Sequence, residues 1–140
     1  MIVLTQEQKT AIEREARQHY PNECCGILAG HIQGRDKCIQ DIYPVSNINQ
    51  ERSVDRYNID PKEFLAVSKR IESLGQSLVG IYHSHPDHPD RPSEFDRGHA
   101  WEVYSYIIVG IEQGKKVSMR SFALDPNRQF QEEEIKIVKP

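Results

Sequence analysis

The chain has 140 residues, of which 37% are hydrophobic and 28% are charged, a composition that excludes a disordered or fibrous class. Its 18 basic and 21 acidic residues give a formal charge of −3, without the basic excess that nucleic-acid binding usually needs. The longest apolar runs, such as Tyr106 to Ile111, are the length of a strand and predict no membrane span. We therefore expect one globular domain over residues 1–140, with neither nucleic acid nor membrane as a partner.

The N-terminal residues and the cysteines indicate the cellular compartment in which we expect the protein. Residues 1–4 lack the basic region and the long apolar region of a signal peptide, and they lead into a polar helical pattern. Three cysteines, Cys24, Cys25 and Cys38, do not make a disulfide framework, and no C-x-x-C pair suggests a zinc knuckle. We interpret them as reduced, buried thiols and expect a cytoplasmic protein.

The first third of the chain predicts one helix and two strands. Thr5 is a typical N-cap, and the helix that it begins extends to about His19, before Pro21. The inward face of this helix carries Ile12, Ala16 and Tyr20. The apolar run from Cys25 to Ala29 predicts a buried strand, and the alternation from Cys38 to Val45 predicts another.

The middle third predicts a loop, a helix and a strand. Residues 46–56 are polar and aperiodic, so we expect a loop. Asp60 followed by Pro61 is typical of a helix N-terminus, and this helix extends to about Leu74. Its inward face carries Phe64, Val67 and Ile71. The run from Ser77 to Ser84 predicts a further strand.

The last third begins with a loop that is too rich in proline for a helix or a strand, with Pro86, Pro89 and Pro92. A short helix is predicted from Ser93 to about Trp101. Three strands follow, at residues 104–111, 117–124 and 129–138, with turns at Gln113-Gly114 and Asp125-Pro126-Asn127. Together the elements predict a mixed α/β domain with a largely antiparallel sheet flanked by helices.

The segment after residue 82 contains the residue types of a metal site. His83 and His85 point to the same face of a strand, because side chains i and i+2 share a face. Asp96 can add a carboxylate from the first turn of the following helix. Two imidazoles and one carboxylate leave the fourth position of a tetrahedral zinc open for water, as in catalytic zinc sites.

Each of these features also has an ordinary interpretation. An H-x-H pair often arises by chance, and Ser93 followed by Asp96 is the pattern of a helix N-cap, although a cap can also aim Asp96 at a metal. A glutamate after a helix, such as Glu23, is ordinarily a solvated charge. The remaining histidines comprise two rival ligands or contacts, His88 and His99, and two expected surface residues, His19 and His31.

The spacing H-S-H-x7-S-x-x-D, from His83 to Asp96, resembles the JAMM motif of the MPN+ metalloprotease family. That family also needs an upstream glutamate, and Glu23 in the sequence N-E-C-C-G-I-L-A-G resembles this element. The resemblance extends from the first helix to about Leu124, and every motif position is filled, unlike in metal-free scaffold members. It implies a single MPN (JAMM) domain with cytidine-deaminase-like layering.

The resemblance also implies which residues act. His83, His85 and Asp96 would bind one Zn²⁺ per chain, which lowers the pKa of a bound water toward about 7. Glu23 would accept a proton as general base and return it to the leaving amine. Ser93 would donate a hydrogen bond to the oxyanion of the tetrahedral intermediate.

Within the family, the compact chain resembles the small prokaryotic branch that processes ubiquitin-like sulfur-carrier proteins. This implies hydrolysis of the amide bond after the C-terminal Gly-Gly of such a carrier, with release of an amino acid or a short peptide. The carrier's tail is expected to lie extended beside the catalytic strand and residues 46–56, in a channel that favours Gly-Gly. The leaving group, the pathway and the oligomeric state stay open.

Three other functions fit parts of the pattern. A non-haem iron enzyme can use the same two histidines and one carboxylate, but Ser93 would then lack a role. A zinc deaminase would need H-x-E and P-C-x-x-C, and neither occurs. A non-catalytic MPN module that binds a ubiquitin-like partner would keep the metal only for stability, and Glu23→Gln would then have little effect on its function.

Overall fold

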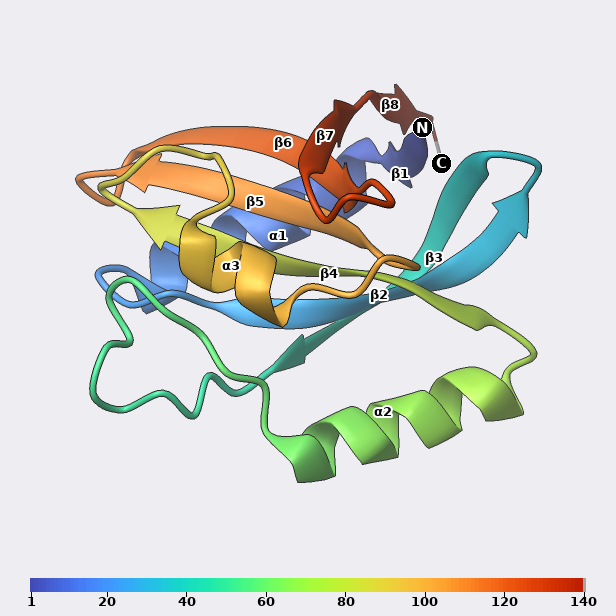
Figure 1. The fold of residues 1–140 in the computed structure, drawn as a ribbon, viewed down its shortest axis with the longest axis horizontal. Coiled ribbons are helices and arrows are strands. Elements are labelled where there is room, and N and C mark those ends of the chain that lie inside the picture. Colours follow the sequence, from blue (N-terminus) through green and yellow to red (C-terminus); the bar gives the residue numbers. More distant parts are fainter. Residues whose placement is uncertain (140) are drawn as a thin grey trace.

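The computed structural model describes residues 1–139, which form an eight-stranded sheet and three helices (Figure 1). In chain order the elements are β1 (Ile2–Thr5), α1 (Gln6–His19), β2 (Cys25–Gln33), β3 (Asp36–Val45), α2 (Pro61–Ser73), β4 (Ser77–Pro86), α3 (Glu94–His99), β5 (Ser105–Glu112), β6 (Lys116–Leu124), β7 (Phe130–Glu133) and β8 (Ile135–Val138). Along the sheet the strands lie in the order β7-β6-β5-β4-β2-β3-β1-β8.

The sheet is largely antiparallel. β4 pairs antiparallel with β2 and parallel with β5, so the strand that contains both motif histidines lies in the middle of the sheet. β1 is parallel to both of its neighbours, β3 and β8, and the remaining pairs are antiparallel. α1 covers one face of the sheet, whereas α2 and α3 lie on the other (Figure 1). The predicted fold class is confirmed.

Both long helices begin as the sequence predicts. Thr5 Oγ1 accepts a hydrogen bond from the N–H of Gln8 at 3.1 Å, and Gln8 Oε1 accepts one from the N–H of Thr5 at 2.9 Å. α1 therefore begins in a capping box. Asp60 caps α2 by accepting from the N–H of Lys62 at 2.9 Å, and Pro61 occupies the first turn, where its missing N–H costs nothing. The predicted inward residues pack in the core, with Ile12 and Ala16 on one face of the sheet and Phe64, Val67 and Ile71 on the other.

The alternation of β4 sends neighbouring side chains to opposite faces. Tyr82 points toward α1, where its hydroxyl donates a hydrogen bond to the buried carboxylate of Glu15. A Cβ atom on Gly26 would lie 2.1 Å from the Tyr82 ring, so glycine is required at this crossing. Ile81 points the other way and packs with Ala100 beyond α3. The two faces of β4 therefore make different contacts, with α1 on one side and with the segment after α3 on the other.

The N-terminal residues lead into the first helix as predicted, but they also form a strand that the sequence did not predict. Ile2–Thr5 forms β1, and Ile2 and Leu4 are 0% and 1% exposed. Its partners are Lys37 and Cys38 of β3 and residues 135–138 of β8. Four residues are too few to show a period, and the strand exists because these distant segments bury it.

The predicted strand at residues 129–138 is also wrong in one respect. It is two strands, β7 and β8, which pair with β6 and β1 at opposite ends of the strand order. Because only Glu134 separates them, the sheet curls until its two edges meet there (Figure 1). Glu133 accepts hydrogen bonds from Ser105 and Ser121 at 2.6 and 2.9 Å, and these contacts hold β7 in place. Within residues 1–139, no helix is both long and apolar enough to cross a membrane.

Candidate active site

β4 presents His83 and His85 on the face that carries α2 and α3, and each residue is only 1% exposed. The strand is held on both sides, since His83 lies in register with Cys25 of β2 and with Ile108 of β5. Burial lowers the pKa of His83, although the charge of Asp96 partly opposes this, so the neutral ring is favoured. A neutral imidazole is the form that binds a metal.

Ser93 and Asp96 form the N-terminus of α3. Ser93 Oγ accepts from the N–H of Asp96 at 3.0 Å, and Asp96 Oδ2 accepts from the N–H of Ser93 at 2.9 Å. The capping box expected from Ser-x-x-Asp is thus present, and the helix is shorter than predicted, ending at His99. The cap fixes the direction in which Asp96, which is 7% exposed, points toward β4.

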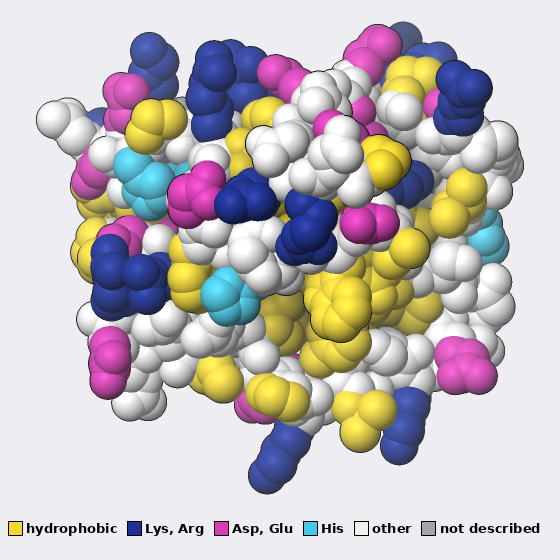
Figure 2. Space-filling model, viewed as in Figure 1, with side chains coloured by type: hydrophobic (Ala, Val, Ile, Leu, Met, Phe, Trp, Pro, Cys, Tyr) yellow, Lys and Arg dark blue, Asp and Glu magenta, His cyan; other side chains and the backbone are white. Residues whose placement is uncertain are grey.

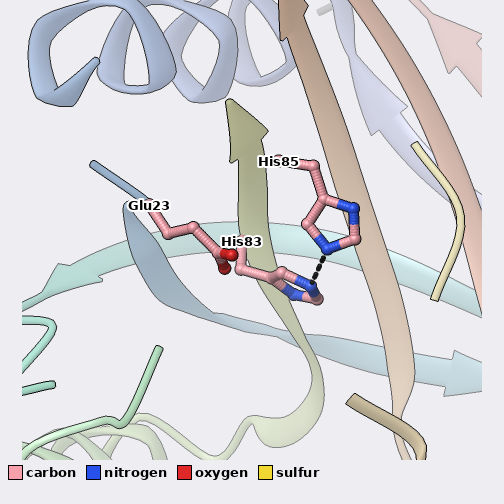
Figure 3. A group of neighbouring side chains, drawn as sticks. All are labelled: Glu23, His83 and His85. Atoms are coloured by element: carbon pink, nitrogen blue, oxygen red, sulfur yellow. Dashed lines mark hydrogen bonds between the residues drawn. The ribbon is translucent and has the colours of Figure 1, made fainter. Parts of the chain in front are cut away.

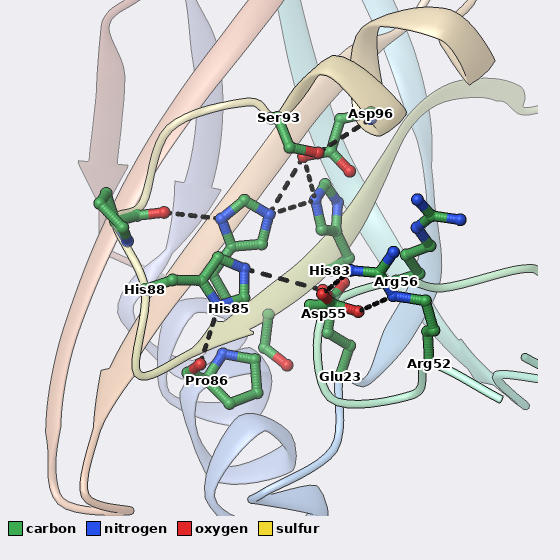
Figure 4. Close-up of polar contacts among 12 residues, drawn as sticks. Glu23, Arg52, Asp55, Arg56, His83, His85, Pro86, His88, Ser93 and Asp96 are labelled. Carbon is green, nitrogen blue, oxygen red and sulfur yellow. Dashed lines mark hydrogen bonds and ion pairs between the residues drawn. The ribbon is translucent and has the colours of Figure 1, made fainter. Parts of the chain in front are cut away.

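Three potential ligand atoms converge at this point (Figure 4). The Nε2 atoms of His83 and His85 lie 3.1 Å apart, and Asp96 Oδ2 lies 3.1 Å from His85 Nε2 and 3.3 Å from His83 Nε2. Ligands at the corners of a tetrahedron, with zinc bonds of about 2.0–2.1 Å, are about 3.3 Å from one another. The donor set and its spacing therefore fit a zinc ion.

Glu23 faces the same point from the loop between α1 and β2 (Figure 3). It is 2% exposed, and within residues 1–139 neither carboxylate oxygen has a hydrogen-bond partner. Glu23, His83 and His85 each offer a ligand atom within 4.8 Å of the others. Burial, together with the charges of Asp96 and Asp55, raises the pKa of Glu23 to about 9. Buried carboxylates without partners are rare, and a cation among these groups would satisfy this one.

A family model described as prokaryotic homologs of the JAB domain matches residues 5–125. The chain belongs to this family. The match confirms the resemblance predicted from the motif, and the JAB-domain assignment agrees with the observed mixed α/β fold.

Individual relatives of this JAB-domain chain cover different shares of it. A desampylase from Haloferax volcanii is 43% identical over 89 residues, which are 63% of this chain and 62%, less than two thirds, of that protein. A CysO-cysteine peptidase from Mycobacterium tuberculosis is 32% identical over 125 residues, which are 89% of this chain and 83% of that protein. Among solved structures, a protein from Desulfitobacterium hafniense is 35% identical, has a TM-score of 0.89, and matches over 100% of this chain and 94% of that one.

The two rival histidines of the JAB-domain chain lie in different places. His88 lies beside the site, with its Nε2 atom 3.8 Å from Glu23 Oε2 and its ring stacked on that of His85 at 4.2 Å (Figure 4). Its Nδ1 atom donates to the carbonyl oxygen of Pro86 at 2.8 Å, which leaves Nε2 directed at Glu23. His99 is exposed on the last turn of α3, where its Nδ1 donates to the carbonyl of Phe95 at 2.8 Å.

The sequence predicts that the loop before α2 lies near the site, but it does not predict which of its side chains contact the site residues. Tyr57 stacks on His83, with ring centroids 4.3 Å apart and planes at 22°. The guanidinium of Arg56 lies 4.6 Å from the centre of the Phe95 ring, which joins this loop to α3. No periodic pattern marks these residues. The only signal in the sequence is that this polar stretch lacks Pro and Gly, which suggests a loop with a defined conformation.

The face that carries α2 and α3 is partly apolar (Figure 2), and a cavity lies beside His88. Figure 2 shows hydrophobic side chains gathered in the middle of the face that carries α2 and α3. Trp101 and Val103, which follow α3, are 66% and 69% exposed. On the other side of His88 is a cavity of about 600 Å³, whose lining includes Asp87, Gly110 and Lys116.

Proposed function

We propose that this JAB-domain chain is a zinc metallopeptidase that cleaves the amide bond after the C-terminal Gly-Gly of a ubiquitin-like sulfur-carrier protein. The observation that carries the proposal is that Glu23, which is buried and has no hydrogen-bond partner for its carboxylate within residues 1–139, stands opposite the three converging atoms of His83, His85 and Asp96. A metal held only for stability would not need that carboxyl group. Relatives named as a peptidase and a desampylase support the reaction class.

His83, His85 and Asp96 are the residues that would hold the zinc. Once bound, the ion supplies a Lewis acid that polarises the scissile carbonyl and makes water a stronger nucleophile. The residues themselves are pre-positioned, because two stand on a central strand and the third on a capped helix. His85 is oriented further by its Nδ1 atom, which lies 2.6 Å from the carbonyl oxygen of Pro89.

Glu23 is the proposed general base and acid. Burial and the nearby charges of Asp96 and Asp55 favour its protonated form, whereas the positive charge of a bound metal would favour the carboxylate. This suits a group that takes a proton from the attacking water and passes it to the nitrogen of the leaving amine. The half-buried His88 is an ionisable neighbour of Glu23, with its Nε2 atom 3.8 Å from Glu23 Oε2.

Ser93 is the proposed hydrogen-bond donor to the oxyanion. Its Oγ atom accepts from the N–H of Asp96 at 3.0 Å, so the lone pair that forms the cap is used while the hydroxyl hydrogen stays available. A single donor of this kind is worth about 2.7–4 kcal/mol in transition-state stabilisation in other hydrolases. Capping and catalysis thus use different parts of one hydroxyl group.

The proposed substrate is the tail of a folded carrier rather than a free peptide. Only an extended, narrow segment can reach a cluster whose members are at most 7% exposed, and Gly-Gly is the narrowest such segment. The exposed Trp101 and Val103, which follow α3, are suited to contact the body of the carrier, because large exposed apolar side chains often bind macromolecules.

The test is a mass-spectrometric cleavage assay. Zinc-loaded protein is incubated with a small ubiquitin-like carrier whose Gly-Gly tail is extended by one residue or a short peptide, beside a chelated sample. The proposal predicts loss of the extension only in the zinc-loaded sample, and slower cleavage when the two glycines are replaced by bulky residues. If no carrier is cut although zinc is bound, the peptidase proposal is wrong.

A further inference from the structure

The carboxylate of Glu23 accepts no hydrogen bond within residues 1–139, and its contact with His88 Nε2 is as long as 3.8 Å, so its position depends mainly on its backbone. Within residues 1–139, both side-chain oxygens lack hydrogen-bond partners, whereas both backbone polar groups are bonded. The N–H of Glu23 donates to the carbonyl of Ser53 at 2.6 Å, and its carbonyl accepts from Asn47 Nδ2 at 3.2 Å. Both contacts come from the loop between β3 and α2. That loop therefore decides where Glu23 stands relative to His83.

Asn47 holds this loop together through one side-chain amide. Its Oδ1 atom accepts from the N–H groups of Asn49 and Asn58, each at 3.0 Å. Its Nδ2 atom donates to the carbonyls of Glu23 and Arg56, at 3.2 and 3.0 Å. Two acceptances and two donations use the full capacity of an amide. A single isolated bridge, between Asn47 and Ile59, is the only strand-like pairing that the described part of this loop makes.

We propose that Asn47 is a positioning residue that fixes the general base Glu23 in front of the metal ligands. This rests on the proposed function, because it assigns Asn47 to the same reaction. Asn47 acts through the backbone of Glu23 and touches neither substrate nor metal. We call the hydrogen bond from Asn47 Nδ2 to the carbonyl of Glu23 the anchoring bond. Because a displacement of about 1 Å in a reacting group costs up to about 100-fold in rate, this bond matters to turnover more than to stability.

Two substitutions isolate the anchoring bond from the rest of the loop. Asn47→Asp keeps the oxygen that accepts from Asn49 and Asn58 but removes both donated bonds. Asn47→Leu removes the amide without adding a charge. Asn49→Asp is the matched control, because Asn49 uses only its oxygen, which accepts from the N–H of Arg52 at 3.0 Å, and the variant adds the same charge to the same loop.

The first measurement is steady-state cleavage of a Gly-Gly-extended carrier, with zinc content and melting temperature determined for each variant. We expect kcat to fall about 10- to 100-fold in both Asn47 variants, with KM and zinc content unchanged, and Asn49→Asp to resemble the wild type. Wild-type kcat in both Asn47 variants overturns the proposal. A loss in Asn47→Asp but not in Asn47→Leu overturns it as well, since the added charge would then be the cause.

The second measurement does not depend on activity and separates this proposal from the proposed function. Amide hydrogen exchange is followed at Glu23, whose N–H is bonded to Ser53. Faster exchange in both Asn47 variants, but not in Asn49→Asp, is expected if Asn47 anchors this backbone. Unchanged exchange overturns the anchoring. If the wild-type protein cleaves no carrier, the peptidase proposal fails, and the exchange result still decides whether Asn47 holds Glu23.

Discussion

The Nδ1 atom of His85 lies 2.6 Å from the carbonyl oxygen of Pro89. Because a carbonyl oxygen can only accept, Nδ1 carries a proton, and Nε2 is the ring nitrogen that faces His83 and Asp96, where it can bind a metal. The proline-rich loop after β4 is thus more than a connection to α3. The loop sets the tautomer of His85 through the carbonyl of Pro89, and it also leads the chain back to the site, where α3 supplies Asp96.

The first prediction concerns the third ligand. Asp96→Asn should lower zinc affinity by about tenfold or more. Substitution of residues that only hydrogen-bond to a metal ligand already lowers metal affinity by that much. α3 should remain, because an amide oxygen can still accept from the N–H of Ser93, a bond of 2.9 Å in the wild type. Zinc per chain is measured by elemental analysis after dialysis against a weak chelator.

Glu94→Gln is the control for this prediction. It changes a nearby acidic residue, which is exposed and within residues 1–139 pairs only with Arg97 on the same helix, so zinc content should stay at the wild-type level. An Asp96→Asn protein that keeps as much zinc as the control would show that Asp96 is not a ligand.

The second prediction concerns the buried carboxyl group on the other side of β4. Burial raises the pKa of Glu15 above its ordinary value of 4.5, against a smaller opposing effect of the hydrogen bond from Tyr82. Above pH 4.5 the folded state therefore binds more protons than the unfolded state, and the free energy of unfolding falls as pH rises through the raised pKa.

Glu15→Gln removes this titration, so its stability relative to the wild type should improve as pH rises from about 4.5 toward neutrality. Urea denaturation of both proteins across this range measures the difference in their free energies of unfolding. A difference that is the same at every pH would mean that Glu15 does not titrate with a raised pKa.

The third prediction tests the contact between β2 and the Tyr82 ring. A methyl group at Gly26 would lie 2.1 Å from that ring, and the buried tyrosine cannot move without losing its bond to Glu15. Gly26→Ala should therefore lower the free energy of unfolding by about 1–3 kcal/mol. Chemical denaturation measures the effect.

Gly98→Ala is the matched substitution. Gly98 lies within α3, and a methyl group there would meet no atom within 4 Å outside its own helix turn and chain neighbours. The change should therefore be neutral or stabilising by up to about 1 kcal/mol. Equal stability of the two variants would refute the close packing described for Gly26.

Local patterns were sufficient to predict the central part of the site. The i, i+2 spacing of His83 and His85 needs only a strand, and the cap of α3 needs only Ser93 and Asp96, so both are readable over a few residues. The placement of Glu23 follows only from the family resemblance, because no periodic pattern connects it to His83, which lies far along the chain.

The remaining features depend on contacts between distant segments. β1 is a strand because β3 and β8 bury it, and the break between β7 and β8 follows from the different partners of these two strands. Asn47 lies in a polar loop, where asparagine is common, and its role depends on four carbonyl and N–H groups that only the folded chain brings together. No spacing rule encodes such contacts.

The most direct test of the central claim is Glu23→Gln, measured for zinc content and for cleavage of a Gly-Gly-extended carrier in the same preparation. The amide has nearly the shape of the carboxyl group but cannot act as a base, so we predict full zinc occupancy and a rate lower by about 10²–10⁴-fold. A zinc-loaded Glu23→Gln protein that cleaves the carrier as fast as the wild type would contradict the proposed role of Glu23 as general base.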